Sequence, residues 1–392
     1  MKNSLATLFL TLCTTACFGQ GALNPTGSPT PTMKTLDQLD AKLEKRTPIS
    51  SLPFNITDSG SYYLTTNLFS TAGYIYVSPQ NVTLDLNGFT MDGSSNALSA
   101  VYCYANIDLN LTIRNGTFRN YGSGAVVVSA TQYPVHFENV QMINGSIGFW
   151  CSSGSTFLNC GFYNNKTYGL ITGISSTIKN CVFSGNGIPA QVGSASVVSG
   201  CTFYTNTGSL NLASSCTISD CTFVGNTAQQ IAGSDGEQIL NCIVRSGGNT
   251  GIGVANASTI KNCLVSQNSQ QGINCGNNCV IQDCQVVSNS VDGISAVSSC
   301  IILNNLTTLN GIGNTIIAGI HTLGSGNRID GNLSRANGGY GIRADGGTGA
   351  DVIIRNTAGA NPTANYSPST GATFGTIQNP SSMTNTFGNV VF

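Results

Sequence analysis

Residues 178–186 read Ile-Lys-Asn-Cys-Val-Phe-Ser-Gly-Asn, and the pattern they define, Ile-x-Asn-Cys-x-Val/Phe-x-x-Asn, returns along most of the chain. Further copies lie at 198–206, 218–226, 260–268 and 281–289, with looser copies at 302–310, 329–337 and 353–361. Self-similarity at a short, fixed period is typical of proteins in which each repeat packs mainly on its neighbours. We therefore expect a stack of similar coils.

The residue before each Cys position measures the length of one coil. Most successive anchors are 20 or 21 residues apart, a step that is too short for two helices but fits three short strands and three turns. Because crossovers between parallel strands are overwhelmingly right-handed, the sequence predicts an all-β fold, a right-handed parallel β-helix of three-strand coils with about 13 repeats of 20–28 residues. The anchors are Asn87, Asn115, Asn139, Asn159, Asn180, Gly200, Asp220, Asn241, Asn262, Asp283, Asn304, Gly331 and Arg355.

Composition and anchor chemistry support this interpretation. Only 8% of the residues are charged, and Gly alone contributes 47, as suits strands joined by tight turns. Asn, Asp and Gly at the anchors tolerate best the left-handed backbone that a sharp corner between strands needs. Arg355 is the exception, and we expect Asn356 to take the corner in that coil.

The first residues have the pattern of an export signal. Lys2 supplies the positive charge, residues 5–12 the apolar core and residues 16–19 the small residues before cleavage. The predicted protein is therefore secreted or held at the cell surface. A lipoprotein acylated at Cys17 is the less favoured alternative, because Thr14 stands where such a signal usually carries Leu.

We predict a signal peptide at 1–19, a flexible lead-in with an N-terminal cap at 20–55 and a β-helix domain at 56–392. Residues 33–46 place Leu at i, i+3 and i+7, which predicts a short amphipathic capping helix. No later apolar run reaches the roughly 20 residues of a membrane span. The formal net charge of −1 argues against a nucleic-acid partner.

The repeats resemble those of right-handed parallel β-helix proteins with the pectin-lyase-like fold. The segments PISSLPF (48–54), GSYYL (60–64) and NVTLDLNGF (81–89) are similar to the N-terminal module of a secreted bacterial subgroup of these proteins. The resemblance implies a fold far more than an activity, because this fold carries many functions.

The motifs that would identify an enzyme of this fold are missing. The paired aspartates, Gly-His-Gly and Arg-Ile-Lys of polygalacturonases do not occur, and Arg328-Ile329-Asp330 is the nearest fragment. The stacked aspartates that hold calcium in pectate lyases have no counterpart either. The resemblance therefore gives no catalytic residues to this chain.

Fifteen cysteines suggest disulfides in an exported protein, but their positions favour packing. Stacked neighbours would have Cβ atoms about 4.8 Å apart, longer than the roughly 3.8 Å of a relaxed disulfide. A straight column brings at most two thiols near one point, whereas zinc needs four ligands. We expect structural thiols, no metal and no cofactor, with disulfides as the alternative. One column holds Cys160, Cys181, Cys201, Cys221, Cys242, Cys263 and Cys284, and a second holds Cys216, Cys279 and Cys300.

Function in a solenoid usually lies along one face. The third residue of a Gly-Ile-x-x strand should point outward by strand alternation, which gives one outward column. Tyr102 and the single tryptophan, Trp150, predict a platform for sugar rings, with a covering loop as the alternative. The column reads Tyr102, Val126, Trp150, Ile171, Pro189, Asn211, Ala232, Gly253, Asn274, Ser295, His321 and Arg343.

The polar end of this column offers groups for acid–base chemistry. His321 and Arg343 come from consecutive coils, with Asp292 and Asp345 close to the same positions. A lyase acting on an acidic polysaccharide needs a base and a cation that neutralises the neighbouring carboxylate, which His321 and Arg343 could supply. Two ordinary surface residues are the alternative.

The leading hypothesis is a non-catalytic exported β-helix that binds a polysaccharide or cell-surface glycan, or acts as a surface adhesin. Its candidate ligand-binding residues are Tyr102, Trp150, Asn274, Ser295, Asp292 and Asp345. The alternative is a polysaccharide lyase or related carbohydrate-active enzyme using His321 and Arg343. The sequence does not fix the oligomeric state.

A second outward row is unusually apolar for a solvent face and predicts an assembly or adhesion surface. A register error of one residue would instead send it inward. The row contains Val182, Thr202, Thr222, Ile243, Leu264, Gln285, Leu306 and Leu333.

Overall fold

Short parallel strands follow one another along almost the whole of the computed structural model, which describes residues 46–95, 99–103, 110–128, 134–346 and 351–392. Each coil contributes a strand to each of three faces. In one typical coil these are β16 (Thr177–Lys179), β17 (Val182–Ser184) and β18 (Ile188–Val192). Every strand pairs in parallel with its equivalent about 20 residues away, as in the pairing of Ile178 with Val198. The predicted parallel β-helix is confirmed.

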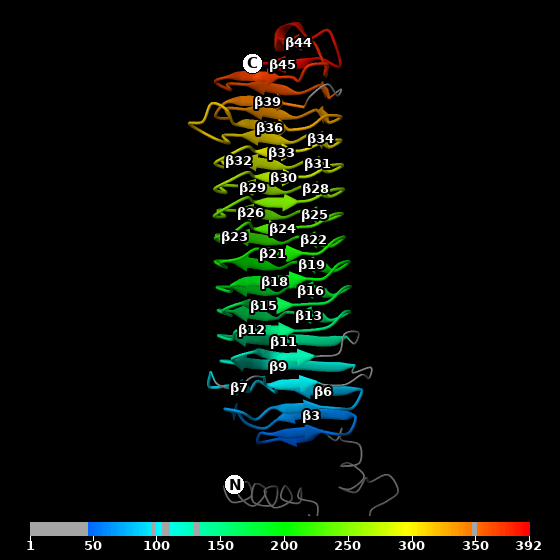
Figure 1. Ribbon diagram of the computed structural model, residues 1–392, viewed down its shortest axis with the longest axis vertical. Coiled ribbons are helices and arrows are strands. Elements are labelled where there is room, and N and C mark those ends of the chain that lie inside the picture. Colours follow the sequence, from blue (N-terminus) through cyan, green and yellow to red (C-terminus); the bar gives the residue numbers. More distant parts are fainter. Residues whose placement is uncertain (1–45, 96–98, 104–109, 129–133, 347–350) are drawn as a thin grey trace, which may run out of the picture. The chain divides into compact units, whose positions relative to one another are not determined.

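The first two faces are joined into one sheet of 30 strands. The first face runs from β1 (Thr47–Ile49) to β43 (Thr373–Phe374), and the second from β4 (Leu68–Phe69) to β45 (Asn389–Val391). The long strands β9 (Leu111–Arg119) and β11 (Val135–Ile143) belong to both. In Figure 1 most first-face strands are labelled on the right of the stack and most second-face strands on the left.

The third face is a separate sheet of 15 strands, and its labels run up the middle of Figure 1. The 15 exceed the 13 predicted repeats, because the first two strands precede Asn87, the first anchor. The strands are β2 (Phe54–Ile56), β5 (Ile75–Val77), β8 (Val101–Cys103), β10 (Gly124–Val128), β12 (Ile147–Trp150), β15 (Tyr168–Ile171), β18, β21 (Leu210–Leu212), β24 (Ile231–Ala232), β27 (Ile252–Val254), β30 (Ile273–Cys275), β33 (Ile294–Ala296), β36 (Ala318–Thr322), β39 (Tyr340–Ala344) and β42 (Ala364–Ser367).

The strands begin within the span predicted as the N-terminal lead-in. Strand β1 starts at Thr47 and pairs with β3 (Gly60–Leu64). Residues 33–45 of the predicted capping helix, like the predicted signal at 1–19, lie outside the described residues. In the described ranges, no helix has the length and apolar character needed to cross a membrane.

Identical residues stack on one another inside the coils. The rings of Phe162, Phe183, Phe203 and Phe223 lie parallel with centroids 4.6–4.7 Å apart. Such contacts add to the burial of each ring, because parallel displaced rings attract one another. The spacing equals one strand separation, so each phenylalanine meets its equivalent in the next coil.

Buried asparagines form a second file. The Nδ2 group of Asn186 donates to Oδ1 of Asn206, at 3.0 Å, and to the carbonyl of Phe162. The backbone N–H of Asn186 donates to the same Asn206 oxygen. Because each amide satisfies polar groups on the coils beside it, the file can be buried without unpaired donors.

The corner prediction is largely confirmed, with one error. Asn180, Gly200 and Asp220 have φ values of 54°, 62° and 57°. The prediction that Asn356 takes the last corner is wrong, because Arg355 itself has φ 58° while Asn356 is buried in an asparagine file. The carboxylate of Asp330 holds the Arg355 guanidinium at that corner.

The described cysteines are all buried and unpaired, and their packing role stays a prediction. In the first column, the N–H of Cys181 faces Sγ of Cys201 at 3.4 Å, so each thiol lies beneath the next coil's equivalent. The premise that at most two thiols approach one point is wrong at one corner. There Cys275, Cys279 and Cys300 place their sulfurs within 4.8 Å of one another.

Candidate functional site

The predicted outward column follows the register of the third face, with two corrections. Trp150, Ile171, Gln191 and Asn211 are consecutive partners. Val126 and Pro189 are instead buried, and Val127 and Gln191 hold the register positions. In β10 and β18 the local Gly pattern is offset from the register of the neighbouring coils, because Val126 pairs with the inward Phe149 and Ala190 with the inward Leu170. We call this row the third-face file; it reads Tyr76, Tyr102, Val127, Trp150, Ile171, Gln191, Asn211, Ala232, Gly253, Asn274, Ser295, His321, Arg343 and Ser367.

Aromatic residues occupy the N-terminal part of the third-face file. Trp150 is 53% exposed and ends strand β12. Tyr102 stands two coils earlier, and its ring centroid lies 6.1 Å from that of Tyr74, which is also exposed. The described residues leave about half of the Trp150 side chain exposed.

Amide side chains continue the file. Gln191 and Asn274 are exposed, and Asn211 is half-buried between them. Ser295 pairs in register with Asn274 and His321 but is only 4% exposed, so little of its hydroxyl is offered to a ligand. The burial of Ser295 therefore argues against a large contact with a ligand, and its role in binding stays a prediction.

At the C-terminal part of the file, four predicted residues come together. Nδ1 of His321 lies 3.0 Å from Oδ2 of Asp292, and Nε2 lies 3.1 Å from Oδ2 of Asp345. His321 and Arg343 are register partners on β36 and β39. Arg343 donates through Nε to Oδ1 of Asp345, at 2.8 Å, and through Nη1 to the carbonyl of Ile316.

The electrostatics of this group favour a charged imidazole. Burial by itself lowers the pKa of His321, but the hydrogen bonds and charges of Asp292 and Asp345 outweigh it and raise the pKa above its usual value. Burial alone would raise the pKa of Asp345, yet Arg343 and His321 lower it. With His321 protonated, two cations face two carboxylates and their charges balance.

That arrangement gives His321 no free lone pair. A general base must accept a proton from a substrate through an unprotonated nitrogen, whereas both ring nitrogens of His321 already face carboxylates. Arg343 is likewise paired with Asp345. The structure shows that His321 and Arg343 are adjacent. Their catalytic roles remain predictions.

A second charged group lies on the first face and was not predicted as a site. Asp330, which is buried, accepts hydrogen bonds from the guanidinium groups of Arg328 and Arg355. The Arg355 interaction lowers the pKa of Asp330. A cavity of about 520 Å³ opens beside them, next to Gly331 and Asn304. The signal in the sequence was the anchor column itself, where Gly331, which has no side chain, stands between Asn304 and Arg355.

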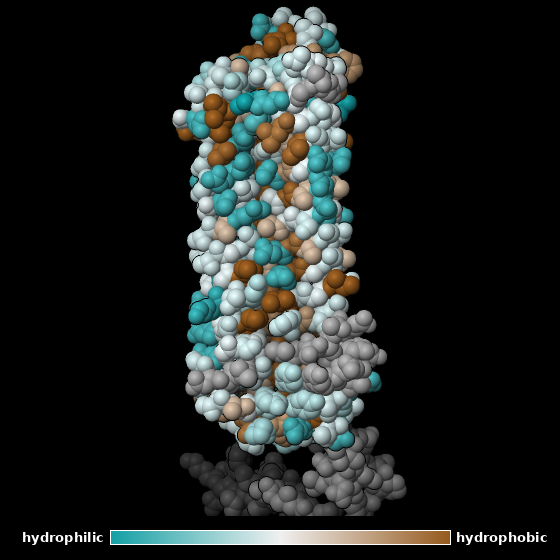
Figure 2. Space-filling view, viewed as in Figure 1, coloured by the Kyte–Doolittle hydropathy of each residue, from teal (hydrophilic) through white to brown (hydrophobic). Residues whose placement is uncertain are grey.

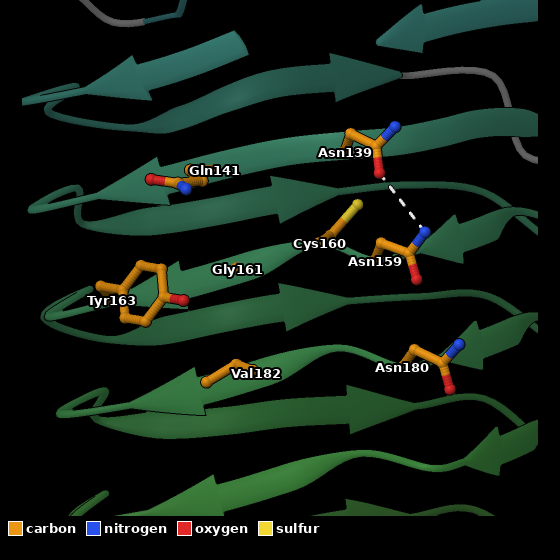
Figure 3. A pocket seen from close by; sticks show the side chains of 8 residues that line it. All are labelled: Asn139, Gln141, Asn159, Cys160, Gly161, Tyr163, Asn180 and Val182. Carbon is orange, nitrogen blue, oxygen red and sulfur yellow. Dashed lines mark hydrogen bonds between the residues drawn. The ribbon is translucent and has the colours of Figure 1, made fainter. Parts of the chain in front are cut away.

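A smaller pocket lies where the first two faces meet, near the long strand β11 (Figure 3). On one side the anchor amides form a chain, in which Asn159 Nδ2 donates to Asn139 Oδ1 at 3.3 Å. On the other side the ring of Tyr163 leans over Gly161, where an added Cβ would meet it at 2.4 Å. The pocket has a volume of about 230 Å³, and sequence analysis missed Tyr163 because it is outside the repeat pattern.

The second outward row is confirmed as outward-facing. Val182, Thr202 and Thr222 are register partners, and Ile243 and Leu264 further along are 40% and 37% exposed. On the face seen in Figure 2, apolar side chains form separate groups among hydrophilic ones. The adhesion role of this row stays a prediction.

Comparison with known proteins was informative for the fold. Residues 87–237, 147–278 and 193–334 match a family described as right handed beta helix region. No curated protein sequence matches significantly.

Several solved structures have similar folds. The Azotobacter vinelandii mannuronan C-5 epimerase AlgE4 A-module is 16% identical, with a TM-score of 0.38, over 80% of this chain and 91% of that one. The Dettilon tailspike protein is 14% identical, with a TM-score of 0.38, over 81% and 62%. Pectate lyase Pel9A is 12% identical, with a TM-score of 0.29, over 84% and 78%. These values describe similarity of fold alone.

Proposed function

Since the chain belongs to the right-handed β-helix family, we propose that it is a non-catalytic glycan-binding protein that holds an extended polysaccharide along the third-face file. The exposed Trp150 at the aromatic part of that file carries the proposal. Contact between water and an exposed indole ring is unfavourable, and a partner that covers the ring removes it. The apolar C–H face of a sugar ring is such a partner.

The spacing of the file suits a polymer. Successive coils rise by about 4.8 Å, which is close to the length of one pyranose unit in an extended glycan. A chain laid along the file would therefore meet one file residue per sugar. Trp150 would stack on a ring, and the amides of Gln191 and Asn274, which lie further along, would exchange hydrogen bonds with hydroxyl groups.

The polar part of the file fits binding better than turnover. Asp292 and Asp345 occupy both nitrogens of His321, and with His321 protonated the charges of the group balance. Such a group holds its shape and offers hydrogen-bonding edges, but has no unprotonated base. We infer that a neutral or weakly charged glycan is preferred over a strongly acidic one.

The site of action follows from the N-terminal pattern. We propose that the protein works outside the cell or at its surface, because residues 1–19 have the composition of an export signal. A polysaccharide binder at that location would meet capsule, wall or environmental glycans.

The test is affinity electrophoresis of the purified protein through gels containing individual polysaccharides, with Trp150→Ala as the variant. Ile174→Ala is the matched control, since Ile174 is 56% exposed but stands in a turn outside the file. We expect retention on at least one glycan, a loss of affinity of tenfold or more in Trp150→Ala, and no change in Ile174→Ala. Failure of the wild-type protein to bind any glycan would refute the proposal.

A carbohydrate-active enzyme is the second candidate, favoured by the register pairing of His321 with Arg343. A lyase would release unsaturated products from pectate or alginate, which absorb in the ultraviolet. Turnover by the wild-type protein that His321→Gln abolishes would replace the binder with this alternative.

A further inference from the structure

At one corner of the coils, Cys275, whose register neighbours are Val254 and Ala296, lies beside the interior column that contains Cys279 and Cys300. Cys275 is the last residue of β30, and Cys279 follows it after a three-residue turn, just before β31 (Val280–Gln282). Cys300 stands one coil further on, before β34 (Ile301–Leu303). The three sulfurs lie within 4.8 Å of one another, and none of the residues is more than 2% exposed.

We propose that Cys275, Cys279 and Cys300 form a buried three-thiolate site for a monovalent thiophilic metal ion, of which Cu(I) is the natural probe. Thiolate sulfur is a soft ligand that selects soft metal ions. With metal–sulfur bonds of about 2.3 Å, an ion in the plane of three sulfurs holds them roughly 4.0 Å apart. Each pair therefore needs to close by less than about 1 Å.

The number of ligands decides the class of metal. Structural zinc is almost always bound by four ligands, and in the described part of the chain the group contains three donors of the His, Cys, Asp or Glu type. A three-coordinate sulfur site suits a monovalent ion with a filled d shell. The site is therefore expected to prefer Cu(I) over Zn²⁺.

The other cysteine column shows why this corner is special. In the column that contains Cys181, Cys201 and Cys221, each thiol has neighbours only above and below, at one coil spacing. The first and third sulfurs of such a run are about 9.6 Å apart, too far to share an ion. Among the described residues, the corner triad is the one group of three candidate ligands this close.

Two of the thiols donate to backbone carbonyls, and these hydrogen bonds are given up when the thiols lose their protons to an ion. The Cys279 thiol donates to the carbonyl of Ala255 at 3.2 Å, and the Cys300 thiol donates to the carbonyl of Gly276 at 3.1 Å. Binding of one Cu(I) would form three copper–sulfur bonds and release three protons to solvent, with no electron transferred. The N–H of Cys279, 3.4 Å from Cys300 Sγ, stays in place to donate to that thiolate.

The site lies close beneath the surface. The turn between Cys275 and Cys279 consists of Gly276, Asn277 and Asn278, and Asn278 is exposed. A small opening of this turn would admit an ion without unpacking the coils. The proposal does not depend on glycan binding, because the triad is interior and separate from the exposed third-face file.

The experiment is an anaerobic titration of the reduced, full-length protein with Cu(I) in competition with a chromogenic Cu(I) chelator. We expect one tightly bound equivalent, a sulfur-to-copper charge-transfer absorption in the ultraviolet and an X-ray absorption spectrum that fits three sulfur ligands. Cys300→Ser should weaken the tight site at least 100-fold. Cys221→Ser, an equally buried thiol of the straight column, should leave it unchanged.

Several results would overturn the site. These are the absence of a tight equivalent in folded wild-type protein, equal affinity in Cys300→Ser, or a Cys275–Cys279 disulfide that accounts for both thiols in protein isolated without reductant. If Cys300→Ser does not fold, the sulfur count from X-ray absorption on the wild-type complex decides alone: three sulfurs support the site and two refute it.

Discussion

Nε2 of His321 lies 3.1 Å from Oδ2 of Asp345, a residue of the following coil. Together with Asp292 on the opposite ring nitrogen, this contact ties three consecutive coils through one imidazole. The side chain of His321 is only 12% exposed, so water competes weakly for these hydrogen bonds. The contact therefore makes the stability of this part of the rod sensitive to pH.

We predict that this pH dependence has a definite sign. The pKa of folded His321 is raised above its usual value of about 6.5, so the folded state holds the proton more tightly than the unfolded state. The stabilisation is complete below about pH 6.5 and is lost as the pH rises through the folded pKa. Urea unfolding from pH 5.5 to 9 should show a falling midpoint, and His321→Gln should flatten that fall. An equal slope in both proteins would contradict the assignment.

Glu237 provides a prediction of a different kind, because its carboxyl group is completely buried in the file that contains Cys216. Its Oε2 accepts a hydrogen bond from the N–H of Cys216, and the backbone of Ser234 also interacts with the carboxyl group. Burial raises the pKa of Glu237 to about 7. The folded state therefore favours the protonated acid, and stability should fall as the pH rises from about 4.5 through 7.

Replacement of Glu237 by Gln keeps the shape and the acceptor while removing the charge. We expect Glu237→Gln to be more stable than the wild-type protein at pH 8, by up to about 3 kcal/mol, and no more stable at pH 4.5. Glu138→Gln on the outside of the rod is the control and should change stability little at either pH. Chemical denaturation at the two pH values measures the difference; a variant less stable at pH 8 would show that the carboxylate has an unrecognised partner.

The asparagine file predicts a large cost for one buried amide. Asn206→Ala removes the acceptor of two groups of Asn186, its N–H and its Nδ2, and leaves the carbonyl of Phe183 without its donor. Unpaired buried polar groups cost about 1–3 kcal/mol each, so a loss of about 3 kcal/mol or more is expected. Asn274→Ala, at an exposed position, should cost under about 0.5 kcal/mol. Similar midpoints for the two variants in urea would contradict the proposed role of the file.

Much of this fold could be predicted because the spacing and residue types of the repeat indicate the length and shape of one coil. Residues equivalent to Asn180 and Cys181 recur once in every coil. Their spacing gives the coil length, the Asn position marks the corner, and the Cys position marks the interior column. The register failed at Val126 and Pro189, where the pairing with the neighbouring strand places the outward residue later than the local pattern does. A repeat predicts the average coil, and departures from it depend on contacts between neighbouring coils.

The same limit explains which site residues were found. His321 and Arg343 were predicted as neighbours because both occupy one column of the repeat. The triad of Cys275, Cys279 and Cys300 was missed because Cys275 belongs to a strand and the others to a corner, so it combines two columns across a turn. A repeat shows which residues stack in one column. The distance between residues of two different columns depends on the turn that separates them.

Arg355 at a left-handed corner leads to the last prediction. A φ of 58° costs an arginine about 1 kcal/mol or more, whereas Asn adopts it readily. In return, its guanidinium donates to Asp330, whose side chain is 4% exposed and also pairs with Arg328. Arg355→Asn therefore relieves backbone strain and loses one of two ion pairs, and the two effects should nearly cancel, so that the urea midpoint changes little.

Asp330→Ala removes both pairs while keeping the strained corner, so its cost should be larger, about 2 kcal/mol or more. In the Arg355→Asn background the same Asp330→Ala change should cost less, because only Arg328 then remains to lose its partner. Urea unfolding of the two single variants and the double variant at pH 7 gives the coupling between Asp330 and Arg355. Additive losses would mean that the two side chains do not stabilise each other. The ion pair with Asp330 would then not explain why arginine occupies this corner.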